Sequence, residues 1–276
     1  GPSGQVWLGG RDLRKFQNRT NTILLDSGVT AEGVHLEPIQ FVDEAVFLTT
    51  RNPASSSVFF TRANREQMKG TWRTVIGSRL VAVGPAAGGD SVLAVADYGE
   101  CYRIPLTEIA KGGFQLESIS RFRLPEKHTS PIGGVAMQDG RLAAWCGVPE
   151  PSMWTFTPTG QLERKWTLPD APQLPPVALD DGVVFAMPGR LHISGTASGR
   201  AAEDYRAAQT QDQQQPWKSL TAVSPTQVLA VTADNKFVRV EYRSAPRPQL
   251  AEVSVTNVPY AIELPPTVSG GFLFLA

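Results

Sequence analysis

Residues 131–169 read PIGGVAMQDGRLAAWCGVPEPSMWTFTPTGQLERKWTLP, and this stretch decides the fold. Short runs rich in apolar, β-branched and aromatic residues are separated by Gly, Asp and Pro, which is the pattern of strands joined by turns. Asp139-Gly140 and Thr159-Gly160 stand at two of these turns, and Gly tolerates the positive φ that a tight hairpin turn requires. The stretch therefore predicts four antiparallel strands, at residues 131–136, 142–145, 153–156 and 163–167.

The same order of strands and turns recurs along the whole chain. Apolar runs follow one another at intervals of about 40 to 50 residues, which is typical of propeller blades, and they are marked by Val6, Val46, Val92, Leu142, Val183, Val228 and Phe272. One four-stranded unit cannot bury both of its faces alone, so neighbouring units must stack. We therefore predict an all-β chain, a β-propeller of four-stranded antiparallel blades that forms a single domain over residues 1–276.

The two ends of the chain are expected to close the propeller together. Residues 6–8, 13–16 and 23–25 read as later strands of a blade, and residues 266–268 and 272–275 as first strands. Joining them completes one blade from both termini, and six blades result. Residues 6–8 and 272–275 both resemble a second strand, so seven blades, or a chain excised from a longer protein, stay open as alternatives.

One repeat carries a family resemblance. Trp154-Thr-Phe-Thr-Pro-Thr-Gly160, followed by Trp166, resembles the repeat of the pyrroloquinoline-quinone-type, or quinoprotein-like, β-propeller superfamily. In that superfamily a strand ends in a Thr-Gly turn, and the Trp that follows docks against the neighbouring blade. The sequence has no WD dipeptide and no Gly-His signature, so it does not support a WD40 assignment. The resemblance implies the non-enzymatic branch of the superfamily and a periplasmic location, although no targeting segment is present in this chain to fix the compartment.

The residues that could carry catalysis are few. Many quinone-dependent members of the superfamily have adjacent cysteines, whereas Cys101 and Cys146 are far apart and are predicted to be buried free thiols. His35, His128 and His192 have no metal-ligand spacing, and His192 falls within a predicted strand. We expect no cofactor and no metal, and a non-catalytic protein is favoured over an enzyme. A pair of hydrolytic carboxylates supplied by different blades would not be visible in the sequence.

Charge and one unusual segment bear on the partner. Lys plus Arg and Asp plus Glu balance at 26 each, which gives no electrostatic footprint for nucleic acid, and no apolar stretch is long enough to span a membrane. The polar, Gln-rich segment 203–217 presents Tyr205, Arg206 and Trp217, residue types enriched in binding hot spots. The sequence thus predicts a monomeric platform that binds another protein through this segment. The alternative is a propeller that binds a small ligand or sugar over its central channel, with or without hydrolysis.

Overall fold

The computed structural model describes backbone strands along the whole chain, and side chains mostly from residue 80 onward. The described residues are 5–8, 12–19, 22–30, 34–35, 40–42, 45–51, 58–64, 70–75, 80–105, 117–124, 132–206, 217–259, 262, 265–269 and 272–274. Every helix or strand assigned within these ranges is a β-strand, as predicted for an all-β chain. The chain divides into two compact units, Gly1–Phe122 with Pro158–Gln161 and Arg123–Thr157 with Leu162–Ala276.

The first unit contains three antiparallel sheets. The first has three strands, β1 (Gln5–Leu8), β2 (Asp12–Arg19) and β3 (Thr22–Thr30). The second has five strands, β4 (Val34–His35), β5 (Gln40–Val42), β6 (Ala45–Arg51), β7 (Val58–Asn64) and β8 (Gly70–Val75). The third has four strands, β9 (Leu80–Pro85), β10 (Ser91–Ala96), β11 (Glu100–Pro105) and β12 (Glu117–Arg121).

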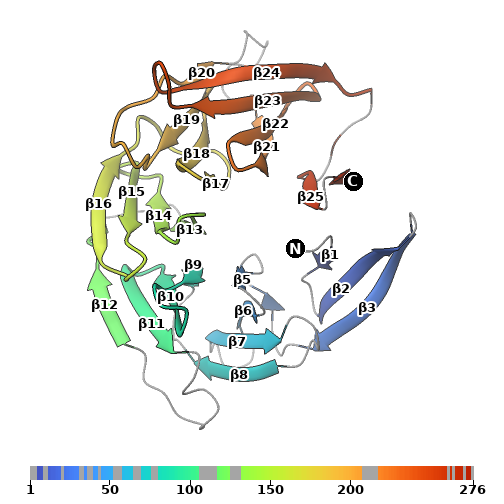
Figure 1. The fold of residues 1–276 in the computed structure, drawn as a ribbon, viewed down its shortest axis with the longest axis vertical. Coiled ribbons are helices and arrows are strands. Elements are labelled where there is room, and N and C mark those ends of the chain that lie inside the picture. The colour runs from blue at the N-terminus through green and yellow to red at the C-terminus, as the bar shows by residue number, and fades with distance from the viewer. Residues whose placement is uncertain are drawn as a thin grey trace. The chain divides into compact units, whose positions relative to one another are not determined.

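The second unit contains three four-stranded meanders and a final strand pair (Figure 1). The first meander is β13 (Gly133–Ala136), β14 (Leu142–Cys146), β15 (Ser152–Phe156) and β16 (Leu162–Thr167). The next is β17 (Val177–Leu179), β18 (Gly182–Met187), β19 (Arg190–Ser194) and β20 (Tyr205–Arg206). Then come β21 (Trp217–Ser224), β22 (Gln227–Thr232), β23 (Lys236–Arg243) and β24 (Gln249–Asn257), and the pair β25 (Thr267–Ser269) and β26 (Phe272–Phe274). The four strands predicted from residues 131–169 are thus confirmed as β13 to β16.

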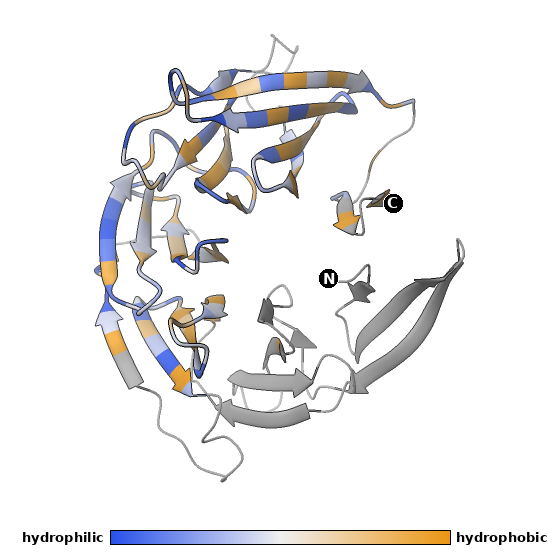
Figure 2. Ribbon diagram, viewed as in Figure 1, coloured by the Kyte–Doolittle hydropathy of each residue, from blue (hydrophilic) through white to orange (hydrophobic). Residues whose placement is uncertain are grey.

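Burial changes with the position of a strand in its sheet. Every residue of β18 is buried, and so is every residue of β10, whereas β16 is exposed along nearly its whole length. Figure 2 shows the same contrast between the hydrophobic β18 and the mostly hydrophilic β16. A strand that packs on both faces needs an apolar side chain at every position. This is why the second strand of each repeat reads as a continuous apolar run instead of an alternating one.

Two clusters of buried side chains fill the spaces between the meanders of the second unit. Phe185 and Met187 of β18 pack with Met153 of the preceding meander. Val184 of β18, which points to the opposite face, packs with Val228 of the following meander. Burying one such side chain stabilises the fold by about 1.5 to 3 kcal/mol. The meanders therefore hold one another through the strand that each of them buries most completely.

The turn after the third strand also packs on another sheet of its unit. Gly160 has a φ of +85°, and a Cβ there would lie 2.7 Å from Ile119 Cδ1. Gly195 has a φ of +75°, and a Cβ there would lie 2.9 Å from Met153 Cε. Trp166 is partly buried against the cluster that contains Met153. These turns therefore dock on a neighbouring sheet as the resemblance implied, which is a feature of packing and does not by itself identify a superfamily. Trp166 pairs with Met153 of its own meander, and its docking on a neighbouring one stays a prediction.

Other predictions have mixed outcomes. Cys101 and Cys146 are both free and buried, as expected. His128 and the side chain of His35 lie outside the described residues. The count of six blades and the blade shared by the two termini stay predictions, because β1–β3 and β25–β26 form separate sheets.

Candidate functional site

The structure buries two of the three residues predicted to contact a partner. Tyr205 is 9% exposed and Trp217 is 5% exposed, and their ring centroids lie 6.5 Å apart. Both rings belong to the apolar cluster between the second and third meanders, so they are core contacts and not surface contacts. Arg206 is exposed. Residues 207–216 lie outside the described part of the chain, and the binding role of this segment stays a prediction.

The polar tips of both aromatic side chains are satisfied within the core. Trp217 Nε1 donates to the carbonyl of Met187 at 3.0 Å, and the Tyr205 hydroxyl donates to Glu252 at 2.7 Å. Burial, together with the hydrogen bond to Glu252, raises the pKa of Tyr205 above its ordinary value, so this hydroxyl remains a donor at neutral pH. These bonds fix β20 and the start of β21 in place.

The other face of β19 and β20 is polar. Leu191 pairs with Tyr205 and Arg190 pairs with Arg206. Because successive side chains alternate between faces, burial of Leu191 and Tyr205 puts Arg190 and Arg206 on the opposite face. His192 lies on that face too, because it is next to Leu191 in β19 and successive side chains alternate. On the neighbouring strand it pairs with Phe185 of β18.

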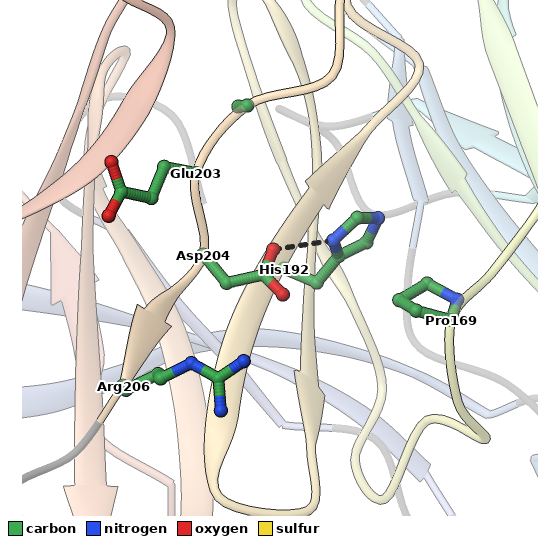
Figure 3. A pocket seen from close by; sticks show the side chains of 6 residues that line it. Pro169, His192, Glu203, Asp204 and Arg206 are labelled. Atoms are coloured by element: carbon green, nitrogen blue, oxygen red, sulfur yellow. Dashed lines mark hydrogen bonds and ion pairs between the residues drawn. The ribbon is translucent and has the colours of Figure 1, made fainter.

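Asp204 joins these side chains into a network. Asp204 Oδ1 lies 2.7 Å from His192 Nδ1, and Asp204 Oδ2 lies 3.4 Å from Arg190 Nη1. Arg190 Nη2 also lies 3.9 Å from a carboxylate oxygen of Asp170. A carboxylate only accepts hydrogen bonds, so Nδ1 of His192 carries the proton and Nε2 is left for another partner. Figure 3 shows this second nitrogen on the side of the ring away from Asp204.

An open pocket of about 550 Å³ lies over this network. Its lining combines charged and apolar groups, namely Pro169, His192, Ala202, Glu203, Asp204 and Arg206. Pro169 comes from the segment that follows β16, and the other residues come from β19, β20 and the residues before β20. The volume is in the range of ligand-binding pockets.

The wall that contains Glu203 is anchored to the third meander. The Glu203 amide donates to the carbonyl of Pro248, and the Leu250 amide donates to the carbonyl of Glu203, both at 2.9 Å. Glu203 thereby forms a parallel bridge with Gln249 of β24, beside β20 (Figure 1). The backbone on both sides of the pocket is thus held by hydrogen bonds.

The chemistry available in the pocket is that of charge recognition. Arg206 can donate two parallel hydrogen bonds to an anion, His192 has a free ring nitrogen, and Glu203 offers a carboxylate. Among the described residues no group of three or more His, Cys, Asp and Glu side chains could hold a metal ion. In that same part of the chain no helix is long and apolar enough to cross a membrane.

Sequence reasoning found only part of this site. It placed Arg206 on the surface correctly, but it named none of His192, Glu203 and Asp204 as a contact. The alternation Leu191-His-Ile193 and Asp204-Tyr-Arg206 is a signal that could have found the polar face. Using it requires the pairing of β19 with β20, which an irregular connection of ten residues conceals.

Comparison with known proteins identifies the fold alone. No protein-family profile matches this sequence, and no curated protein sequence is similar to it. The chain is similar in structure to the RRP9 WD40 repeats, with a TM-score of 0.66 and 10% identity over 99% of this chain and 83% of that chain. It is similar to the Cps50 (Swd1) β-propeller domain of Myceliophteria thermophila, with a TM-score of 0.52 and 15% identity over 83% and 73%. For BamB from Moraxella catarrhalis the TM-score is 0.54 and the identity 13%, over 100% and 92%.

These neighbours do not decide between propeller superfamilies. WD40 repeats are among them although the sequence lacks the WD40 signatures, and every identity is too low to carry function. Membership in the quinoprotein-like superfamily and in a non-enzymatic branch therefore stays a prediction. What the four-stranded meanders and the neighbours establish together is that this chain is a β-propeller.

Proposed function

We propose that this β-propeller is non-catalytic and binds another protein, serving as an interaction or assembly platform. The observation that carries the proposal is the open, charged pocket on β19 and β20. Arg206 is exposed there, and among the described residues neither Arg206 nor Glu203 has a side-chain partner. Binding residues concentrate on loops and edges held by a rigid scaffold, and Arg is enriched at the energetic centres of interfaces.

The residues that hold the walls of the pocket in place favour rapid and specific binding of a partner. Tyr205 and Trp217 hold β20 from behind through buried contacts, and the hydrogen bonds of Glu203 to β24 hold the other wall. A site whose backbone is already ordered loses little conformational entropy when a partner binds. The segment predicted from sequence thus keeps a part in the proposal, with Arg206 as its contact and the two aromatic residues as its supports.

A propeller that binds a small ligand or sugar is the second candidate. The specific observation in its favour is the pocket volume of about 550 Å³, which suits a small molecule. The ligand would then occupy this pocket, whereas the sequence suggested a site over the central channel.

Photocrosslinking from the pocket tests the proposed function. A photoreactive phenylalanine analogue replaces the exposed Pro169, which lines the pocket, in one variant and the exposed Val255 of β24 in a matched control. Both variants are irradiated in a lysate of the protein's own source. We expect a discrete protein adduct from position 169 and none from position 255. Tyr205 and Trp217 are unsuitable for this test because their loss would disturb the core.

Binding of the purified partner completes the test. We expect Arg206→Glu to weaken that complex at least about tenfold. Arg239→Glu, the same charge reversal at an exposed residue of β23, should change it less than about twofold. Equal adducts at positions 169 and 255, or none at position 169, would contradict the proposal.

A further inference from the structure

Arginine side chains face each other across β19 and β20. Arg190 and Arg206 are paired in register, and like charges directly opposite each other destabilise a sheet. Arg190 is compensated, because Asp204 and Asp170 lie 3.4 and 3.9 Å from its guanidinium. Arg206 has no such carboxylate among the described residues. Of the two positive charges, that of Arg206 is thus the one that no carboxylate of the described residues compensates.

Asp204, two residues before Arg206 in the chain, cannot compensate Arg206 without giving up its own partners. Asp204 uses one oxygen for His192 and the other for Arg190, and both oxygens are held within a side chain that is only 16% exposed. The same bond to Asp204 leaves the second nitrogen of His192 on the side of the ring away from Asp204 (Figure 3). Two groups, the Arg206 guanidinium and His192 Nε2, are thus available to an incoming molecule.

The pocket also contains a negative charge that restricts the ligand. Glu203 lines the same pocket, and its carboxylate points away from His192 (Figure 3). A doubly charged anion such as phosphate would be repelled by this carboxylate more strongly than a singly charged one. A singly charged, planar carboxylate matches the Arg206 fork, and a peptide amide beside it could donate to Glu203.

We propose that the pocket binds a carboxylate of the partner protein through Arg206, while His192 Nε2 accepts a hydrogen bond from a backbone amide of the same segment. The inference rests on the proposed function and names the chemistry that the partner presents, a single Asp or Glu side chain in an extended, otherwise uncharged segment. His192 is oriented for this contact by Asp204, and Asp204 is in turn oriented by Arg190.

Fluorescence anisotropy with defined peptides tests the inference on the full chain. The probe is a fluorescein-labelled Gly-Ser hexapeptide with one central Glu and an amidated C-terminus, and the same peptide with Lys or Gln in place of Glu serves as control. We expect saturable binding of the Glu peptide alone, weaker at higher salt. Arg206→Glu should weaken it at least about tenfold, Arg206→Lys less because the bidentate contact is lost but the charge is kept, and Arg239→Glu less than about twofold.

Free acetate distinguishes a small carboxylate from a protein segment. Competition by acetate as effective as that of the unlabelled Glu peptide at equal carboxylate concentration would overturn the assignment to a protein segment. Equal binding of the Glu and Lys peptides, or binding unchanged by Arg206→Glu, would overturn the carboxylate inference. If position 169 still crosslinks to a protein in that case, the proposed function stands and only the chemistry of its partner is wrong.

Discussion

Gly160 shows how one residue without a side chain sets the distance between two packed segments. Its φ is +85°, and an added Cβ would lie 2.7 Å from Ile119 Cδ1 and 3.1 Å from Leu93 Cδ2. Gly89 has a similar φ of +73°, yet a Cβ there would have no atom within 4 Å. Substitutions at the two glycines therefore distinguish the free-energy cost of a left-handed backbone from the additional cost of a steric contact.

Gly160→Ala and Gly89→Ala should differ in their effect on stability. We expect Gly89→Ala to lower the free energy of unfolding by about 1 kcal/mol, the cost of the left-handed conformation alone. Gly160→Ala should lower it by roughly 2 to 3 kcal/mol, because overpacking adds to that cost. Urea denaturation of the full chain measures both values, and equal losses would contradict the packing of this turn.

The buried thiols make a second prediction at the residue scale. Burial raises the pKa of Cys101 from 9.0 to about 12, and burial also raises the pKa of Cys146. Since the thiolate is the reactive form, neither thiol should react with Ellman's reagent at pH 8 in the native protein, and both should react in urea. Rapid reaction of either thiol without denaturant would contradict this burial.

The same pKa shift gives a pH dependence of stability. A folded-state pKa above the unfolded value contributes stability that is fully present below the unfolded value. For Cys101 this contribution should be lost as the pH rises from about 9 toward about 12. Cys101→Ala should reduce that alkaline loss, as followed by urea denaturation between pH 8 and pH 11.

Residue types correctly predicted that these thiols are buried, but they wrongly predicted that Tyr205 and Trp217 are surface contacts. Cysteines flanked by apolar strand residues are usually buried, and both are. Aromatic residues beside a Gln-rich segment resemble an exposed binding loop. Here Tyr205, near the end of the second meander, and Trp217, at the start of the third, both pack in the core that the two meanders share. Only the packing of one meander on the next reveals that, and sequence spacing does not contain it.

At the scale of elements, the strands can be predicted from the local sequence pattern, whereas the pocket depends on which strands pair. The turns at Asp139-Gly140 and Asp181-Gly182 could be recognised because their glycines take positive φ, +82° and +131°. The short β20 could not, because its two residues pair with β19 across a long irregular connection. The network of His192 and Asp204 depends on that pairing, and this is why it was missed.

Trp217→Phe tests the junction between the second and third meanders. The substitution keeps most of the ring but removes the hydrogen bond from Nε1 to the buried carbonyl of Met187. Leaving a buried carbonyl without its donor should lower the free energy of unfolding by about 1 to 3 kcal/mol. Val255→Ala, at a position 45% exposed, serves as the control and should change it by less than about 0.5 kcal/mol. Unchanged stability in Trp217→Phe would contradict the role of this bond.

At the scale of the whole molecule, closure by both termini can be tested through energetic coupling. Deletion of residues 1–8 and deletion of residues 270–276 are made singly and together. If the two ends complete one blade, the double deletion should lower the free energy of unfolding by clearly less than the sum of the single losses, with a coupling above about 0.5 kcal/mol. Additive losses in urea denaturation would favour separate sheets. Repeat spacing predicted the propeller class, but spacing alone does not determine which end strands pair.

The turn glycine at position 195 has a consequence for how such a chain can evolve. Because Gly195 lies against Met153 of the preceding meander, each repeat is shaped to fit one particular neighbour. A repeat copied by gene duplication into a new position would meet side chains selected against a different turn. Exchange of repeats should therefore succeed only together with compensating substitutions, and positions 153 and 195 should vary together among homologous sequences.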